Sequence, residues 1–221
     1  MSTLPRTERK EYTRPAMSER KRFIAVAGNI GAGKTELVGF LCRRYGLKPF
    51  YEPNDTNPYL ADFYKDMKAH AFRSQIYFLT HKFRLHRELE KEPGTVVQDR
   101  TIYEDAEIFA RNLFRQRLID KRDWQTYSEL YEIISRSLEP PDIMIYLKAQ
   151  VRTLRHRIGM RGREMEADLP TTYLKRLNDL YEDWFSRYRL SPVLTLCTDN
   201  LDYLTDLVDR IDVLKQIERY L

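Results

Sequence analysis

Cysteine and histidine are scarce in this sequence, with two and four residues respectively among 221. Cys42 and Cys197 lie far apart, and each stands in apolar surroundings, which predicts buried free thiols rather than a disulfide framework or a zinc site. The two histidines closest in sequence, His81 and His86, are five positions apart, a poor match to one helix face. We therefore expect a reducing compartment and no metal held by histidine.

Long apolar runs are also absent. No stretch of about 18 or more apolar residues occurs, so no segment is expected to span a bilayer. The first 21 residues contain no apolar run and include three glutamates, which disfavours a secretory signal or a mitochondrial transit peptide. We expect a soluble cytoplasmic protein with a flexible basic tail, residues 1–21, and one domain, residues 22–221.

The positive charge of the chain is concentrated at one end. Net charge is +5, and residues 1–22 contain seven Lys/Arg against three Asp/Glu, a net of +4 that leaves +1 for all the rest. A globular part so close to neutrality gives no reason to expect nucleic-acid binding.

Five short apolar runs have the composition of buried strands. Unbroken runs are typical of parallel strands covered on both faces, and the helical periodicity between them predicts an α/β fold with a five-stranded parallel sheet flanked by helices. The connection 53–94 should hold two helices, because a structureless loop of that length would be unusual. The runs are 22–28, 47–52, 95–99, 142–148 and 192–198.

An aromatic-rich stripe follows helical spacing in the last third of the chain. Such a stripe is the ordinary way in which an amphipathic helix joins a core, so we interpret it as core rather than as a binding surface. Its residues are Tyr173, Leu177, Tyr181, Trp184 and Tyr188.

A glycine-rich octapeptide, GNIGAGKT, follows the first apolar run and precedes a helical pattern. Strand, G-x-x-x-x-G-K-[ST] loop and helix in this order predict a P-loop for a nucleoside triphosphate, in which backbone N–H groups and the helix N-terminus face the phosphates. Lys34 is expected to reach the β and γ phosphates and Thr35 to bind Mg²⁺. The expected ATP-binding residues are Gly28, Asn29, Ile30, Gly31, Ala32, Gly33, Lys34 and Thr35.

Charged side chains end two other predicted strands. Glu52 stands before Pro53 in FYEP, and Asp99 precedes Arg100 at the end of TVVQDR. Because the carboxyl ends of parallel strands meet at the ligand crevice, Glu52 could accept a hydroxyl proton. Asp99 could hold Mg²⁺, and Arg100 could stabilise the transferred phosphoryl group. No Asn-Lys-x-Asp element is present, which disfavours a GTPase.

Arginines cluster in the segment RHRIGMRGRE. Arg157 and Arg161 are four apart on one helix face, with Arg163 beyond Gly162. Arginines flanked by glycines suit a lid, about residues 157–170, that closes over phosphates and excludes water. By itself the pattern would describe a solvated basic helix, and the P-loop is what favours an arginine-rich lid.

These motifs, together with FYKD followed by RSQ and with DRTIYED, resemble the deoxyribonucleoside kinases, most closely their bacterial deoxyadenosine/deoxyguanosine branch. The resemblance runs from about residue 22 to the C-terminus. It implies a P-loop kinase fold, ATP as phosphoryl donor, Mg²⁺ and usually a homodimer. It also implies that Glu52 is the general base for the 5′-hydroxyl, that Arg100 lies near this hydroxyl and that Asp99 assists the Mg²⁺.

Nucleoside recognition is implied in the same way. Tyr64 matches the tyrosine that contacts the 3′-hydroxyl and crowds the 2′ side of the sugar, and Glu166 matches a lid glutamate with the same role. Gln75 matches the glutamine that pairs with the base. Asp105 matches the acid found in members that accept cytosine or purines, rather than the small residue of thymidine-accepting members.

Helical spacing groups further residues with these. Gln75, Phe78, Leu79 and Lys82 share one helix face and could line one pocket wall. Asp105 and Phe109 are four apart on the next helix, so that an acid and a stacking ring would face the same pocket. Lys82 lies about 10 Å along the helix from Gln75, at 1.5 Å rise per residue. At that distance it could pair with Asp105.

Two positions depart from the animal members of the family. Asn57 stands in place of a pocket tryptophan, and Gly159 in place of a lid residue that is often arginine; both suit the bacterial branch. The adenine of ATP is expected near residues 199–203. The resulting interpretation is an ATP-dependent deoxyadenosine kinase that also accepts deoxyguanosine or deoxycytidine. The alternatives are a thymidylate-kinase-like nucleoside monophosphate kinase and a catalytically silent structural relative.

Overall fold

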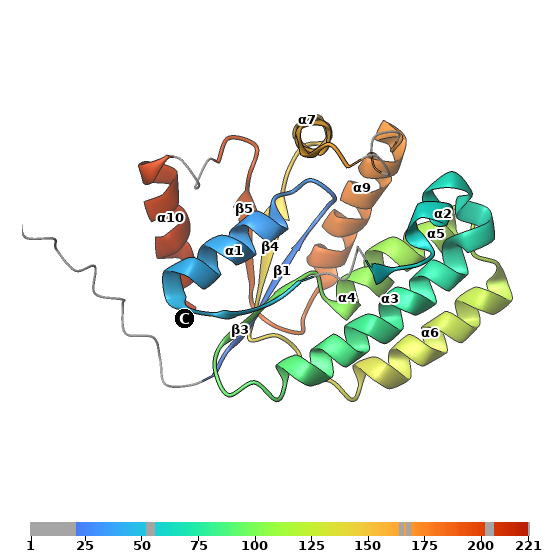
Figure 1. Ribbon diagram of the computed structural model, residues 1–221, viewed down its shortest axis with the longest axis horizontal. Helices are drawn as coiled ribbons and strands as arrows, with labels where there is room; N and C mark the ends of the chain where they lie inside the picture. The colour runs from blue at the N-terminus through green and yellow to red at the C-terminus, as the bar shows by residue number, and fades with distance from the viewer. Residues whose placement is uncertain (1–20, 52–55, 164–165, 167–168, 202–205, 221) are drawn as a thin grey trace, which may run out of the picture.

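A computed structural model describes residues 21–51, 56–163, 166, 169–201 and 206–220. Five parallel strands form one sheet in the order β2-β3-β1-β4-β5 (Figure 1). The strands are β1 (Phe23–Gly28), β2 (Lys48–Phe50), β3 (Val96–Asp99), β4 (Ile143–Lys148) and β5 (Val193–Cys197). Each lies within one of the five predicted runs, so the predicted parallel sheet is confirmed. The predicted N-terminal tail, apart from Lys21, lies outside the described residues.

The central strand β1 explains why the sequence is so apolar there. All six of its residues are buried, and Val26 is in register with Asp99 of β3 on one side and Ile145 of β4 on the other. A strand paired on both edges and covered on both faces has no position that reaches water, so FIAVAG carries no polar side chain.

Helices occupy the connections between the strands. The segment 53–94 contains α2 (Leu60–Lys65) and α3 (Met67–Leu89), which confirms the two predicted helices. After β3 the chain forms α4 (Ile102–Glu104), the π-helix η2 (Asp105–Ala110) and α5 (Arg111–Arg115). The other helices are α1 (Lys34–Tyr45), α6 (Lys121–Ser135), α7 (Val151–Arg161), α9 (Thr171–Arg187) and α10 (Leu207–Glu218).

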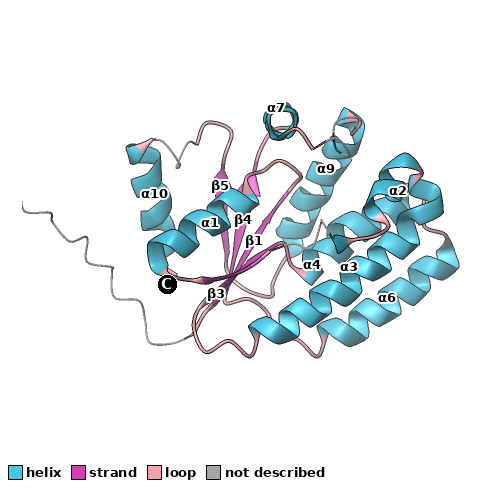
Figure 2. Ribbon diagram, viewed as in Figure 1, coloured by secondary structure: helices cyan, strands magenta, loops and turns pink. Residues whose placement is uncertain are grey.

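Helices cover both faces of the sheet, as Figure 2 shows. On one face α1, α7 and α10 pack around Ile24 and Val26 of β1. On the other face α3, α6, α9 and the segment α4–η2 pack around Phe23 and Ala25. Alternate residues of one strand thus serve two separate cores, as the two-residue period of a strand requires.

Four residues of the predicted aromatic stripe lie on α9 and Tyr188 directly follows this helix; all five are buried, which confirms the core interpretation. The expectation of free cysteines is confirmed, but the expectation that they are buried is wrong, because Cys42 is half-buried and Cys197 is exposed. Cys197 reaches solvent because β5 is an edge strand whose alternate side chains face outward. Among the described helices, none is long and apolar enough to cross a membrane.

Three chain segments leave the sheet at its carboxyl edge and meet there. β1 leads into the octapeptide loop, β3 into Arg100, and β4 into α7. Because β1 lies between β3 and β4, the loop is flanked by the other two segments. The candidate site is therefore at this edge.

Candidate functional site

The octapeptide 28–35 joins β1 to α1, with Gly28 as the last residue of the strand and Lys34 as the first residue of the helix. Gly33, with a φ of 93°, immediately precedes the helix. Nζ of Lys34 donates hydrogen bonds to the carbonyl oxygens of Gly28 at 2.9 Å and Asn29 at 3.1 Å. The ammonium group therefore lies within the curve of the loop and next to the partly positive N-terminus of α1, an arrangement suited to phosphate oxygens.

Two glycines allow the loop to pass close to its neighbours. A Cβ atom on Gly28 would lie 2.8 Å from the carbonyl oxygen of Leu147, and one on Gly31 would lie 2.9 Å from that of Leu154. Gly31 also has a left-handed φ of 80°. Since a side chain would overlap with backbone at both positions, glycine is required for the loop to keep this shape.

Asn29 connects the loop to α9. Its Nδ2 donates to the carbonyl oxygen of Leu174 at 3.0 Å and to Oδ1 of Asn178 at 2.7 Å, while its own Oδ1 accepts from the amide of Ile30 at 2.7 Å. The side chain of Asn29 thus fixes the loop backbone rather than facing the cleft. Asn29 was predicted to bind ATP, and with this side-chain orientation any such contribution would come through the shape of the loop.

Thr35 and Asp99 meet between α1 and β3. Oγ1 of Thr35 donates a 2.6 Å hydrogen bond to Oδ2 of Asp99. The other carboxylate oxygen, Oδ1, is buried and lacks a hydrogen-bond partner within the described residues. Carboxylate and hydroxyl oxygens fit Mg²⁺, which otherwise keeps water and phosphate ligands. The described residues contain no group of three or more His, Cys, Asp or Glu that could hold a metal by themselves.

Arg100 follows β3 in an uncommon conformation. Its φ of 64° is left-handed, and its side chain is 3% exposed. Nη1 donates to Oε1 of Glu104 at 3.1 Å and to the hydroxyl of Tyr181 at 2.9 Å, and Cζ lies 4.3 Å from the centroid of the Phe109 ring. Backbone strain of this kind clusters at functional sites, and here it accompanies a guanidinium group held from several sides.

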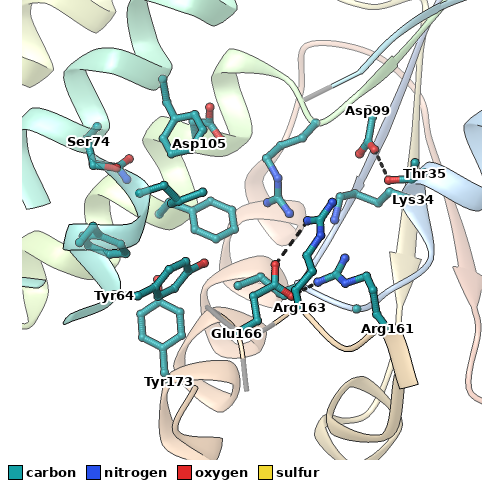
Figure 3. Close-up of a pocket in the computed structure, with 18 residues that line it drawn as sticks. Lys34, Thr35, Tyr64, Ser74, Asp99, Asp105, Arg161, Arg163, Glu166 and Tyr173 are labelled. Atoms are coloured by element: carbon teal, nitrogen blue, oxygen red, sulfur yellow. Dashed lines mark hydrogen bonds and ion pairs between the residues drawn. The ribbon is translucent and has the colours of Figure 1, made fainter. Parts of the chain in front are cut away.

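A pocket opens beside Arg100, lined by residues of the phosphate loop, of α2 and α3 and of η2. In Figure 3 Tyr64 and Asp105 lie on its helical side, opposite Lys34 and Asp99. The pocket brings together most of the predicted site residues, namely Ile30, Gly31, Lys34, Thr35, Tyr64, Gln75, Phe78, Asp99, Arg100, Asp105, Phe109, Arg161, Arg163 and Glu166.

Gln75 and Asp105 are two polar residues on the helical side of the pocket. Gln75 is 4% exposed, and its Oε1 has no hydrogen-bond partner within the described residues. Oδ2 of Asp105 lies 3.3 Å from Nζ of Lys82, as the helical spacing predicted. Lys82 differs from the expectation in its position: it is fully buried behind Asp105 and donates to the carbonyl oxygen of Arg100 at 2.9 Å, rather than lining the pocket wall.

The three predicted lid arginines lie at two different places. Arg161 and Arg163 both form ion pairs with Glu166, the latter at 3.5 Å, and all three line the pocket. Arg157 lies elsewhere and donates to Thr198 and to the carbonyl oxygen of Ala32.

A second cavity, of about 560 Å³, borders the same loop. Gly33, Arg157 and Leu201 line it, and Arg161 lines both cavities. The loop Lys34 also borders both. The two cavities share the phosphate loop, so one could hold a phosphoryl donor and the other a phosphoryl acceptor.

Several residues that line the pocket could not be distinguished from core residues by the sequence. Leu60, Phe63 and Ser74 face the pocket from α2 and α3. Tyr173 belongs to the aromatic stripe and is buried, yet it also lines the pocket, and burial raises the pKa of its hydroxyl to about 12. Helical periodicity alone does not distinguish a core residue from one at the floor of a pocket.

Three predicted elements fall partly or wholly outside the described residues. Glu52, the predicted general base, is one of them, and the predicted lid, about residues 157–170, includes the undescribed residues 164, 165, 167 and 168. Of the predicted adenine loop 199–203, Asp199 accepts a 2.8 Å hydrogen bond from the amide of Gln150 at the start of α7, and Leu201 lines the second cavity. Residues 202 and 203 are not described.

Comparison with known proteins places the chain with one family. Residues 24–221 match the family model "Deoxynucleoside kinase". A deoxyadenosine/deoxycytidine kinase of Bacillus subtilis (strain 168) is 38% identical over 185 residues, covering 83% of this chain and 85% of the relative. A deoxyguanosine kinase of Lactobacillus johnsonii is 37% identical over 203 residues, covering 88% and 90%.

Solved structures give the same match. The structure of a deoxyadenosine kinase from M. mycoides with bound dATP has a TM-score of 0.76 and 30% sequence identity, covering 88% of this chain and 97% of that one. The similar proteins act on nucleosides with different bases.

Proposed function

The chain belongs to the deoxynucleoside kinase family, and from this premise we propose that it is an ATP-dependent deoxyadenosine kinase that also accepts deoxyguanosine or deoxycytidine. The enzyme is a phosphotransferase that acts on a hydroxyl of a deoxynucleoside, and its fold is the P-loop fold of the similar deoxyadenosine kinases. The base preference rests on one observation, the Asp105 carboxylate on the helical side of the pocket.

A carboxylate offers acceptors and no donor, so it favours a base that presents an exocyclic amino group. Adenine, guanine and cytosine carry such a group and thymine does not. The Gln75 amide, with an acceptor oxygen that has no partner among the described residues, could add a donor–acceptor pair to the same base edge. Phe78 and Phe109 also line this pocket and offer apolar ring surfaces to the flat base.

The proposed mechanism consists of positioning and electrostatics. Glu52 accepts the proton of the 5′-hydroxyl as this oxygen attacks the γ-phosphorus of ATP, and the bond between that phosphorus and the β,γ-bridging oxygen breaks so that ADP leaves. Lys34 and the loop amides hold the phosphates, and Arg100, with Arg161 and Arg163, neutralises the charge on the transferred group. Tyr64 and Glu166 orient the sugar through its 3′-hydroxyl, so that the attack is in line.

Thr35 and Asp99 are the residues that would hold Mg²⁺. Their contact at 2.6 Å and the buried, unpartnered Oδ1 of Asp99 support this assignment. When bound, the ion would neutralise charge on the ATP phosphates.

The rival functions receive less support. A thymidylate-kinase-like enzyme would accept a nucleoside monophosphate, whereas the family match favours a deoxynucleoside acceptor. A catalytically silent relative would have no need for Lys34, the Thr35–Asp99 contact and a strained Arg100 around one cleft.

The proposed lid, about residues 157–170, is supported by the charge pattern at the end of α7. The helix ends at Gly162, which has a left-handed φ of 66°. Arg161 and Arg163 then meet Glu166 at the border of the pocket. A cytoplasmic location is proposed as well, since both cysteines are free, which suits a reducing compartment.

We also propose a homodimer, formed through the outer faces of α3 and α6, which lie side by side in Figure 1. A shallow groove on α3 is lined by Phe72, Ile76 and Tyr77. On α6 the side chains of Leu130 and Ile133 are 37% and 70% exposed. Exposed apolar residues on adjacent helices favour a protein partner, here a second copy of the chain. Light scattering at micromolar concentration that gives the monomer mass would contradict the dimer.

One assay tests the proposed substrate preference. Steady-state kcat/KM is measured with ATP and each of the four deoxynucleosides, and with dAMP and dTMP as acceptors. The expected result is a preference for deoxyadenosine, measurable activity with deoxyguanosine or deoxycytidine, and thymidine last. Thymidine as the best substrate would overturn the base assignment. Phosphorylation of the monophosphates without the deoxynucleosides would overturn the proposed acceptor.

A further inference from the structure

Glu104 is a buried carboxylate to which neither the motifs nor the proposed mechanism gives a role. It is the last residue of α4, directly before η2, and none of its side chain is exposed. A charged side chain is almost never fully buried unless it is paired and hydrogen-bonded. Its partners therefore indicate why it is there.

The Oε1 atom of Glu104 accepts hydrogen bonds from three directions. The amide nitrogen of Gly28 lies at 3.0 Å and Nη1 of Arg100 at 3.1 Å, and the hydroxyl of Tyr181 is a third, shorter contact. Gly28 is the first residue of the phosphate loop, and Arg100 is one of the arginines that line the pocket proposed for the acceptor. One carboxylate oxygen thus touches both the donor side and the acceptor side of the site.

The carbonyl oxygen of Gly28 is held by the same group. It lies 2.9 Å from the hydroxyl of Tyr181 and accepts from Nη2 of Arg100 at 3.4 Å. Both backbone polar atoms of the first loop residue therefore contact Glu104, Arg100 or Tyr181. This loop residue is also packed tightly, since an added Cβ would overlap with the Leu147 carbonyl oxygen at 2.8 Å.

We propose that Glu104 is a positioning residue for phosphoryl transfer, because it holds the phosphate loop and the Arg100 guanidinium in one fixed mutual orientation. Tyr181 completes this arrangement from α9. The inference rests on the proposed role of Arg100 at the transferred phosphoryl group. Because Glu104 contacts both, the loss of its carboxylate would let Arg100 shift relative to the loop that carries the ATP phosphates.

The mutual position of Arg100 and the loop matters because the rate of phosphoryl transfer depends on the distance between the reacting groups. Phosphoryl transfer depends on alignment of donor and acceptor, and a displacement of about 1 Å can lower a rate by about a hundredfold. A guanidinium group on a long side chain has several accessible rotamers, and a paired carboxylate with bound donors selects one of them. Glu104 is not among the residues that line the two cavities, so its effect should appear in turnover rather than in binding.

The first test is a comparison of Glu104→Gln with the matched control Glu107→Gln. Glu107 lies on η2, three residues further on, and pairs at the surface with Arg111 and Arg187. We expect Glu104→Gln to lower kcat about 10- to 100-fold while the KM values for deoxynucleoside and ATP change less than about threefold. Glu107→Gln should stay within about twofold of the unmodified enzyme. An unchanged kcat in folded Glu104→Gln would overturn the proposal.

A double-mutant cycle with Arg100→Lys separates positioning from a general structural effect. If Glu104 acts through Arg100, then Glu104→Gln should cost less than about threefold in the Arg100→Lys background. A further 10- to 100-fold loss in that background would show independent effects and would overturn the proposal. Normal turnover in Arg100→Lys would instead remove the proposed role of Arg100, and this inference with it, while the base preference would stand.

Tyr181→Phe tests the same arrangement if Glu104→Gln does not fold. This change removes the hydroxyl that contacts Glu104, Arg100 and Gly28 and keeps the buried ring. The expected result is a kcat lowered about 3- to 10-fold, with KM for both substrates nearly unchanged. Turnover equal to that of the unmodified enzyme, in a variant with normal thermal unfolding, would count against the proposal.

Discussion

Lys82 and Asp105 form a buried ion pair in which Nζ lies 3.3 Å from Oδ2 and the two side chains are 0% and 5% exposed. The same ammonium group donates to the carbonyl oxygen of Arg100 at 2.9 Å. The pair therefore connects the base end of the pocket with the backbone of the residue proposed to act at the phosphoryl group. Its loss should affect both substrate choice and stability.

Asp105→Ala should shift the substrate preference toward thymidine, because the pocket loses its acceptor for an exocyclic amino group. It should also leave Lys82 as a buried cation without its carboxylate, which costs about 3–5 kcal/mol of unfolding free energy. The measurements are kcat/KM for the four deoxynucleosides and urea unfolding.

The double variant Asp105→Ala/Lys82→Met is the matched control, since it removes both charges and keeps an apolar chain of similar length. It should recover most of the lost stability and keep the altered preference. An unchanged substrate ranking in both variants would show that Asp105 does not read the base.

Glu52→Gln should lower kcat by orders of magnitude with only a modest loss of deoxynucleoside affinity, because an amide cannot accept the hydroxyl proton. Affinity is measured by calorimetry and kcat by steady-state kinetics. Turnover equal to that of the unmodified enzyme would remove Glu52 as the base.

Asp99→Asn should raise the Mg²⁺ concentration that gives half-maximal activity, by about tenfold or more, because a neutral amide is a weaker ligand for this ion than a carboxylate. Thr35→Ser, which keeps the hydroxyl group, should change this concentration little. Activity is titrated with Mg²⁺ after treatment with EDTA. An Asp99→Asn curve equal to that of the unmodified enzyme would exclude Asp99 as a ligand.

Gly159→Ala should stabilise the protein by about 0.5–1 kcal/mol, since glycine is unfavourable inside a helix. Gly159 lies within α7, and a methyl group added there would meet no atom within 4 Å among the described residues. Gly31→Ala is the contrast, because its Cβ would overlap with Leu154 and its φ is 80°; it should weaken ATP binding. Thermal unfolding and ATP calorimetry compare the two, and a destabilised Gly159→Ala would contradict the argument.

Acidification should destabilise the fold through His86. Its ring is fully buried on α3, Nε2 donates to the carbonyl oxygen of Glu139 at 2.9 Å, and burial lowers the pKa of the imidazole below its usual value. The unfolded chain therefore binds the proton more readily, and stability falls as the pH drops below about 6.5.

His86→Gln is the matched variant, because its amide can still donate to Glu139 and does not titrate. Between about pH 7.5 and pH 5.5 the melting temperature of the unmodified protein should fall more than that of the variant. Parallel curves for the two proteins would show that His86 does not contribute to the acid sensitivity.

Much of the fold follows from local patterns in the sequence. The apolar runs predicted every strand, because a strand buried on both faces excludes polar residues. The spacing in GNIGAGKT predicted the loop, because the glycines are required by backbone contacts at Gly28 and Gly31. The seven-residue separation of Gln75 and Lys82, with Asp105 on the next helix, predicted a pair that the structure contains.

Other features depended on how distant elements pack. Nothing in the sequence around Tyr181 distinguished a stripe residue from one whose hydroxyl contacts Gly28 and Glu104, which are 153 and 77 positions away. The position of Lys82 behind Asp105 and the contact of Arg157 with Thr198 likewise required the structure. Periodicity specifies which face of a helix is buried but not which atoms it meets.

The sequence by itself determined the strands, the phosphate loop and the chemical types at the strand ends. The tertiary structure alone decided which of those groups share one hydrogen-bonded cluster, because that depends on the angles and distances between elements far apart in the chain.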